Sequence, residues 1–168
     1  MKESRGTLRV GTRTSRLALG QTRDTLARLG ALFPALRFEE AGVSSPGDRD
    51  RTTDLRVSPP DFFTRDLDRM LLAGELDFAV HSAKDLPDPM PEGLDWFWLP
   101  WREDPRDALI RPPGLGLDGL PANPRIGVSS SRREEYCRRR FPGAQWLPIR
   151  GNIEERLQLL DSGQFDLL

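Results

Sequence analysis

A polar cluster, His81-Ser-Ala-Lys-Asp85, follows the apolar run Phe78–Val80 and ends before Pro87. The apolar run predicts a short buried strand, and the proline prevents its continuation. In open α/β sheets, ligand sites are built at the carboxyl ends of strands. The lysine of this cluster, Lys84, is notable because Lys2 is the only other lysine in the sequence. We therefore expect a functional ammonium–carboxylate pair, the alternative being a surface loop with a fortuitous ion pair.

Three further segments have the pattern of a strand that turns into a helix: Gly11–Arg16, Gly127–Arg133, and Arg150–Asn152 with Arg156 one turn later. A helix N-terminus offers free N–H groups to anions, and arginine side chains bind carboxylates bidentately. These segments predict a small ligand with several carboxylates, while phosphate is disfavoured because no Gly-rich P-loop is present. The candidate binding residues are Arg13, Ser15, Ser129, Arg132, Arg133, Arg150, Gly151, Asn152 and Arg156.

The composition excludes several classes of protein. No apolar run approaches the length that spans a bilayer, and a net charge of −1 argues against an overall nucleic-acid binder. One cysteine and one histidine exclude an intramolecular disulfide and argue against a metal site or a Ser-His-Asp triad. Positive charge is concentrated between Arg125 and Arg156, where an anion would bind. We expect no metal, no membrane and no nucleic acid as partners, and a cytoplasmic location.

Strands and helices alternate along the chain, which is typical of α/β folds with mainly parallel sheets. The fold class predicted is two small lobes around a cleft, with residues 1–100 forming the first lobe and 101–168 the second, incomplete at its C-terminus. Residues 44–60 are predicted to form a mobile polar loop. Strands are expected at 8–12, 36–43, 78–80, 94–99, 107–110, 125–128, 145–149 and from 165, and helices at about 15–29, 61–74, 132–140 and 153–160.

Five segments in the same order resemble the porphobilinogen deaminase family, also called hydroxymethylbilane synthase. They are Gly-Thr-Arg-x-Ser from residue 11, His-Ser-Ala-Lys-Asp-Leu-Pro from 81, Arg-Glu-Asp-Pro-Arg-Asp-Ala from 102, Ser-Ser-Ser-Arg-Arg from 129 and Arg-Gly-Asn from 150. The resemblance covers essentially the whole chain and corresponds to the N-terminal portion of the family. It implies a periplasmic-binding-protein-like, two-lobed fold.

The resemblance also implies a transferase of tetrapyrrole (haem) biosynthesis, which condenses porphobilinogen into linear hydroxymethylbilane with loss of ammonia. By the family's pattern, Asp85 is the catalytic carboxylate, which binds pyrrole N–H groups and stabilises the cation formed as ammonia leaves. Ser82, Lys84 and the strand-end residues above are implied to bind the substrate and a dipyrromethane cofactor. Whether the isolated chain is an enzyme stays open at this point.

Two departures from the family pattern matter. The sequence Ser58-Pro-Pro-Asp61 stands where the family has a Gly-Gly-Lys-Gly loop. The family's third domain is expected to be absent, and with it the cysteine to which the cofactor is attached. Cys137 lies on a predicted helix and is interpreted as a small packed or surface thiol.

Two other interpretations stay open. The chain fits a non-catalytic, two-lobed binding module for a polycarboxylate, pyrrole-like ligand, which the departure at residues 58–61 favours. It also fits a piece of a longer or split enzyme that a second polypeptide completes. The presence of both Lys84 and Asp85 favours descent from the enzyme.

Overall fold

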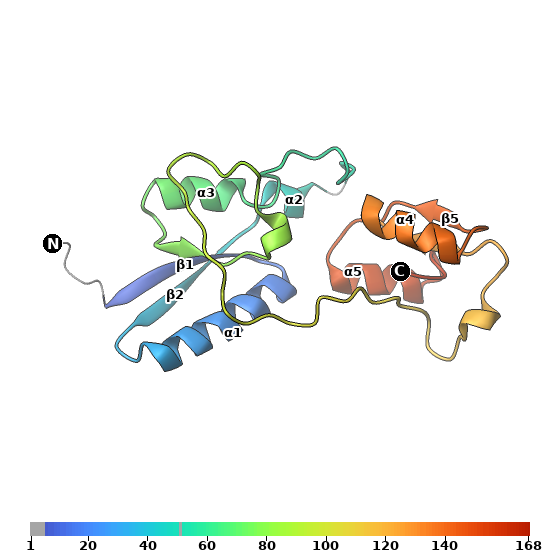
Figure 1. Cartoon of the computed structure of the whole chain (residues 1–168), viewed down its shortest axis with the longest axis horizontal. Coiled ribbons are helices and arrows are strands. Elements are labelled where there is room, and N and C mark those ends of the chain that lie inside the picture. The colour runs from blue at the N-terminus through green and yellow to red at the C-terminus, as the bar shows by residue number, and fades with distance from the viewer. Residues whose placement is uncertain (1–5, 51) are drawn as a thin grey trace. The chain divides into compact units, whose positions relative to one another are not determined.

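The computed structural model describes residues 6–50 and 52–168 (Figure 1). The described chain divides into two compact units. The first unit comprises residues 6–50 and 59–97, and the second comprises 52–58 and 98–168. Each unit contains parallel strands and helices, so the predicted α/β class with parallel sheets is confirmed.

The first unit is built on a parallel sheet with the order β2-β1-β3. Strand β1 (Thr7–Arg13) lies in the middle, beside β2 (Arg37–Val43) and β3 (Phe78–Ala79). Val10 is fully buried at the centre of β1. A Cβ at Gly11 would lie 2.6 Å from the side chains of Leu67 and Leu76, so glycine lets these leucines pack directly on the strand.

Helices α1 (Arg16–Leu32) and α3 (Arg65–Leu72) pack beside this sheet (Figure 1). Ser15 caps α1 by accepting a hydrogen bond from the backbone N–H of Ala18 at 3.3 Å. The buried hydroxyl of Thr22 donates to that of Thr12 at 2.7 Å, which ties α1 to β1. Leu67, only 1% exposed, anchors α3.

The polar segment 44–60 is not simply a mobile loop, as the sequence suggested. It contains the short helix α2 (Pro46–Arg49), which begins with a complete capping box. The hydroxyl of Ser45 accepts from the N–H of Asp48 at 3.2 Å, and the Asp48 carboxylate accepts from the N–H of Ser45 at 3.0 Å. The prediction of a loop was wrong for residues 46–49, because proline and glycine were interpreted as breakers, although proline is favoured in the first turn of a helix.

The second unit contains the parallel pair β4 (Arg125–Gly127) and β5 (Gln145–Leu147) with helices α4 (Ser131–Arg140) and α5 (Ile153–Asp161). Its core is formed by Ile149, Leu160 and Phe165. The C-terminal residues continue the sheet on the other side of β4 through a parallel bridge between Ile126 and Leu167. Two short 3₁₀ turns, η1 (Ala83–Asp85) and η2 (Leu117–Gly119), complete the elements of the described chain.

The strands predicted at 94–99 and 107–110 are wrong, because both segments are irregular. Only Ile110 is paired in a sheet-like manner, exchanging backbone hydrogen bonds of 2.9 Å with Leu168 in both directions. Prolines at positions 100, 105, 112 and 113 flank these segments and remove backbone donors that a ladder would need. Their apolar side chains misled the sequence interpretation, since Phe97 and Trp98 are strongly exposed.

Candidate functional site

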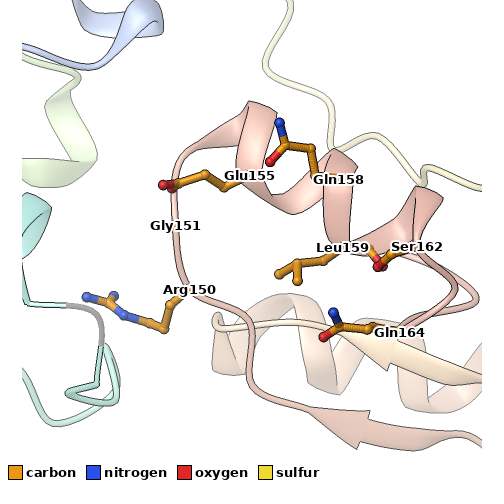
Figure 2. Close-up of a pocket in the computed structure, with 7 residues that line it drawn as sticks. All are labelled: Arg150, Gly151, Glu155, Gln158, Leu159, Ser162 and Gln164. Atoms are coloured by element: carbon orange, nitrogen blue, oxygen red, sulfur yellow. The ribbon is translucent and has the colours of Figure 1, made fainter.

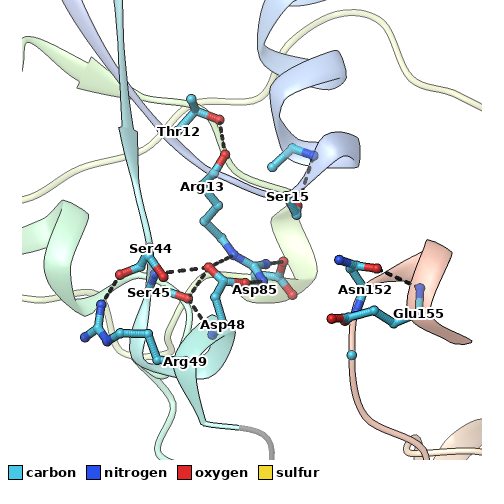
Figure 3. A network of polar contacts seen from close by, with 12 residues as sticks. Thr12, Arg13, Ser15, Ser44, Ser45, Asp48, Arg49, Asp85, Asn152 and Glu155 are labelled. Carbon is cyan, nitrogen blue, oxygen red and sulfur yellow. Dashed lines mark hydrogen bonds and ion pairs between the residues drawn. The ribbon is translucent and has the colours of Figure 1, made fainter.

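Three elements of the first unit bring Arg13, Asp48 and Asp85 together (Figure 3). Arg13 ends β1, Asp48 lies on α2, and Asp85 ends η1. The Nε of Arg13 donates to Oδ2 of Asp48 at 3.1 Å, and its Nη2 pairs with the other oxygen of that carboxylate. Its Nη1 donates to Oδ2 of Asp85 at 3.3 Å. One guanidinium group thus holds two carboxylates.

The guanidinium group of Arg13 is also packed on an aromatic ring. Its Cζ lies 4.2 Å from the centroid of the Phe63 ring. Phe63 in turn packs on Gly47, where no Cβ would fit against the ring. A cation over a ring face is electrostatically favourable. Arg13 is therefore fixed from three sides by residues of its own unit.

Burial and charge act in opposite directions on the groups around Arg13. Burial raises the pKa of Asp48, but hydrogen bonds from Arg13 and Ser45 outweigh it, so this pKa lies below its usual value. Burial lowers the pKa of His81, and Arg13 adds to this, while Asp68 and Asp85 oppose it. The net direction is downward, so His81 is neutral at neutral pH. Its Nε2 is buried and has no hydrogen-bond partner among the described residues.

The other candidates of the first unit lie nearby but make different contacts. Lys84 is exposed and forms no ion pair with the described residues, so the pairing of Asp85 is with Arg13 rather than with its neighbour. The Ser82 hydroxyl donates to Oε1 of Gln21 at 3.2 Å. Ser15 uses its hydroxyl to cap α1. A lysine without a carboxylate partner is available to an anionic ligand.

In the second unit, Arg132 and Arg133 at the start of α4 share one carboxylate, that of Asp107. Arg132 donates to one oxygen at 2.9 Å and Arg133 to the other at 2.9 Å. Burial raises the pKa of Asp107, but the bonds from the two arginines outweigh it and lower the pKa. Both arginines stay substantially exposed, with 73% and 48% of their side-chain surface accessible to solvent. One carboxylate thus leaves an excess of positive charge here.

The turn between β5 and α5 carries the remaining basic candidates. Gly151 has φ of +102°, a conformation that favours glycine, and Asn152 caps α5 by accepting from the N–H of Glu155 at 2.9 Å. The Nε of Arg156 donates to the carbonyl oxygen of Gly151 at 2.9 Å. Burial lowers the pKa of Arg156, and the positive charges of Arg150 and Arg133 lower it further, while Glu155 opposes the shift.

The positive charges of Arg133 and Arg150 therefore lie near enough to Arg156 to act on it. Ser129 belongs to the same strand end, but its hydroxyl donates to the carbonyl oxygen of Ile149 and accepts from that residue's N–H at 3.2 Å. Ser129 therefore ties the ends of β4 and β5 together. The group formed by Arg133, Arg150 and Arg156 is the part of this unit that is suited to bind an anion.

A hollow of about 460 Å³ runs along one side of α5 (Figure 2). Arg150 and Gly151 lie at one end of the hollow. Leu159 lies between them and Gln164 and points into the hollow. The other lining residues are Glu155, Gln158 and Ser162. Its mixed polar and apolar lining adjoins the arginine-bearing turn. No group of three or more potential metal ligands occurs in the described part of the chain.

Sequence reasoning missed Asp48, Phe63 and Asp107. The signal for Asp48 was present, because Ser45-x-x-Asp48 is the spacing of a helix capping box. Asp107 lies within the Arg102–Ala108 segment that carried part of the family resemblance, but its pairing with two arginines depends on tertiary contacts. No local pattern marked the ring of Phe63 as a support for Arg13.

Comparison with known proteins identifies the family. The model of a family described as "Porphobilinogen deaminase, dipyromethane cofactor binding domain" matches residues 8–168. The chain belongs to the porphobilinogen deaminase family. The enzymes so named from Syntrophobacter fumaroxidans and Deinococcus radiodurans are 41% and 42% identical to it over 162 and 166 residues. These alignments cover 96% of this chain, and 52% and 54% of the relatives.

The chain thus spans about half the length of the curated relatives that it matches. Among solved structures, the periplasmic VFT2 domain of Bordetella pertussis BvgS is similar, with a TM-score of 0.50 and 20% identity. That alignment covers 96% of this chain and 65% of the other. At this identity the likeness concerns the fold alone, and it agrees with the periplasmic-binding-protein-like class expected from the sequence. No described helix is long and apolar enough to cross a membrane.

The residues present fit a dipyrromethane group, which bears several carboxylates. Arg132 and Arg133 share one carboxylate, that of Asp107, and the positive charges of Arg150 and Arg133 add to burial in lowering the pKa of Arg156, an effect that a bound anion would counter. Arg133, Arg150 and Arg156 would hold such carboxylates.

Proposed function

We propose that this chain is the active-site portion of a porphobilinogen deaminase, acting in tetrapyrrole biosynthesis. The reaction condenses porphobilinogen into linear hydroxymethylbilane and releases one ammonia for each bond formed. The observation that carries the proposal is the carboxylate of Asp85, which accepts a single guanidinium N–H from Arg13 and keeps its other oxygen for a ligand. The positive charges of Arg133 and Arg150 near Arg156 support it.

Asp85 is proposed as the catalytic carboxylate. When the aminomethyl C–N bond of porphobilinogen breaks, nitrogen leaves as ammonia and positive charge develops over the pyrrole. A carboxylate that accepts the pyrrole N–H stabilises this charge. Attack by the free α-carbon of another pyrrole then forms the C–C bond, and that carbon loses its proton. Oδ1 of Asp85 suits this role, since no described residue donates a hydrogen bond to it.

The basic residues are proposed to bind the acetate and propionate groups of the pyrroles. Lys84 supplies an ammonium in the first unit, and Arg132, Arg133, Arg150 and Arg156 supply guanidinium groups in the second. A bound dipyrromethane would supply the pyrroles to which substrate units are added. The part of the relatives that this chain does not match would be supplied by further chain or by a second polypeptide. The enzyme would be located in the cytoplasm.

The first prediction concerns binding by the chain itself. A synthetic dipyrromethane with acetate and propionate groups should bind, and calorimetry should show weaker binding as salt is raised. Asp85→Asn should keep a melting temperature close to wild type but lose affinity, because its bond from Arg13 is long and contributes little stability. Arg150→Ala should also weaken binding, whereas the surface variant Asp24→Asn should not. If Asp85 were only a local cap, stability would fall by about 0.5–2 kcal/mol with affinity unchanged.

A second experiment separates the enzyme from a non-catalytic binding module. The chain is mixed with the remaining half of the Syntrophobacter fumaroxidans relative, and ammonia release from porphobilinogen is measured. We expect release that depends on both halves and is abolished by Asp85→Asn. Tight dipyrromethane binding without ammonia release, although the two halves associate, would favour the binding module.

A further inference from the structure

Arg13 divides its hydrogen bonds unequally between two carboxylates (Figure 3). The Nε–Nη2 edge of the guanidinium, which makes bidentate pairs, is directed at both oxygens of Asp48. Asp85 receives one N–H, from Nη1, at 3.3 Å on a single oxygen. Asp48 and Asp85 have the same exposed fraction, 18%, so exposure does not explain the inequality. Asp48 therefore forms the bidentate pair with Arg13, which is the stronger of the two interactions.

Asp48 is fixed independently of Arg13. Its Oδ2 accepts from the backbone N–H of Ser45 at 3.0 Å and from the Ser45 hydroxyl at 2.7 Å. Ser45 is 2% exposed, and the N–H of Gly47 donates to the carbonyl oxygen of Phe62 at 2.9 Å, which attaches α2 to the segment before α3. The Asp48 carboxylate is therefore a rigid acceptor to which Arg13 conforms.

We infer that Asp48 is a positioning residue for Asp85, a conclusion that rests on the proposed role of Asp85. By occupying the bidentate edge of Arg13, Asp48 limits Asp85 to one guanidinium N–H and leaves its Oδ1 for pyrrole donors. Without Asp48, the guanidinium closes bidentately on Asp85, because an arginine edge and a carboxylate form their strongest pair in that geometry. The oxygens of Asp85 are then satisfied within the protein and are lost to the ligand.

The test is a double-mutant cycle on dipyrromethane binding by the 168-residue chain. Asp48→Asn should weaken binding by roughly tenfold in the wild-type background and by less than about twofold in the Asp85→Asn background, because Asp48 acts through Asp85. Ser45→Ala is the matched control, since it removes the hydroxyl bonds of the capping box, while the backbone N–H of residue 45 still holds Asp48 and Asp48 keeps its bidentate pair with Arg13. It should lower the melting temperature and leave affinity unchanged.

An equal loss of affinity in both backgrounds, or none in either, would overturn the inference. So would a loss for Ser45→Ala as large as that for Asp48→Asn, which would assign the effect to α2. If Asp48→Asn does not fold, Asp48→Glu, which displaces the carboxylate by one methylene group, should give the same non-additive pattern.

A crystal structure of the Asp48→Asn chain without ligand decides the inference separately from the proposed function. We expect the Nε and Nη2 of Arg13 on the two oxygens of Asp85. An Arg13 that keeps its wild-type position, or turns to solvent, would refute the positioning role. If wild type binds no dipyrromethane, the proposed function fails, while this structural result still decides whether Asp48 restrains Arg13.

Discussion

Strand-end arginines serve different purposes in the two units. In the first unit, Arg13 is packed on a ring and surrounded by two carboxylates, so acidic groups outnumber the cation that joins them. In the second unit, Arg132 and Arg133 share one carboxylate, and Arg156 is repelled by Arg133 and Arg150. In the first arrangement one arginine is paired with two carboxylates, whereas in the second two arginines divide one carboxylate between them.

The difference shows that an arginine at the carboxyl end of a strand is not by itself a ligand-binding residue. What decides its role is how many acceptors the fold places around it. Arg13 has partners from α2 and η1, which are separated from it by 35 and 72 residues along the chain. Such an arginine is suited to hold carboxylates of the protein in place. An arginine in a group of cations is instead suited to bind an anion from solution.

The largest difference between the two units is expected in how much the loss of an arginine lowers the free energy of unfolding. Arg13→Ala leaves Asp48 and Asp85 without their shared cation and uncovers the ring of Phe63, so the free energy of unfolding should fall by about 1–3 kcal/mol. Arg133→Ala removes an exposed ion pair and should change it by less than about 0.5 kcal/mol. Urea unfolding of both variants measures the difference. Similar small losses for both would mean that the two clusters do not differ in the way described.

The sequence predicted the strands and helices that carry the arginines of both units, because these elements depend on residues that are close together in the chain. The parallel strands and the helices that follow residues 15, 130 and 152 were predicted from apolar runs and capping residues, and the structure contains them. The sequence also assigned Arg13 and Arg133 to one class of residue, because both belong to segments in which a strand turns into a helix. Their different environments depend on Asp48 and Asp107, whose contacts bridge long separations in sequence.

A smaller difference between the two units is expected when a carboxylate that pairs with arginine is removed. Asp107 competes with an anionic ligand for Arg132 and Arg133, so Asp107→Asn should raise the affinity for the dipyrromethane by about threefold. The effect is opposite in sign to that expected for Asp48→Asn, although both variants remove a carboxylate from an arginine. Asp104→Asn, which removes an exposed carboxylate paired with Arg106, is the matched control and should have no effect. Calorimetry at fixed ionic strength provides the measurement, and weaker binding by Asp107→Asn would show that Asp107 orients the arginines for the ligand.

The smallest effect concerns acid sensitivity, which should differ between the units at mildly acidic pH. The chain has one histidine, His81, and burial holds its pKa below the usual value, with Arg13 adding to the effect and Asp68 and Asp85 opposing it. The unfolded chain therefore binds a proton near pH 6.5 that the folded chain resists, so stability is complete above about pH 6.5 and falls as the pH decreases toward the folded-state pKa.

The loss should be confined to the first unit, because Asp48 and Asp107, whose pKa values are lowered, stay ionised in this range. Hydrogen exchange between pH 7.5 and 5.5 should show faster opening of backbone amides in β1 and β3, and little change in β4 and β5 once the intrinsic pH dependence is removed. His81→Gln has no titrating group at this position and should abolish the difference between the units. If the second unit opened as readily as the first, or if the variant kept the same slope, the acid response would come from groups other than His81.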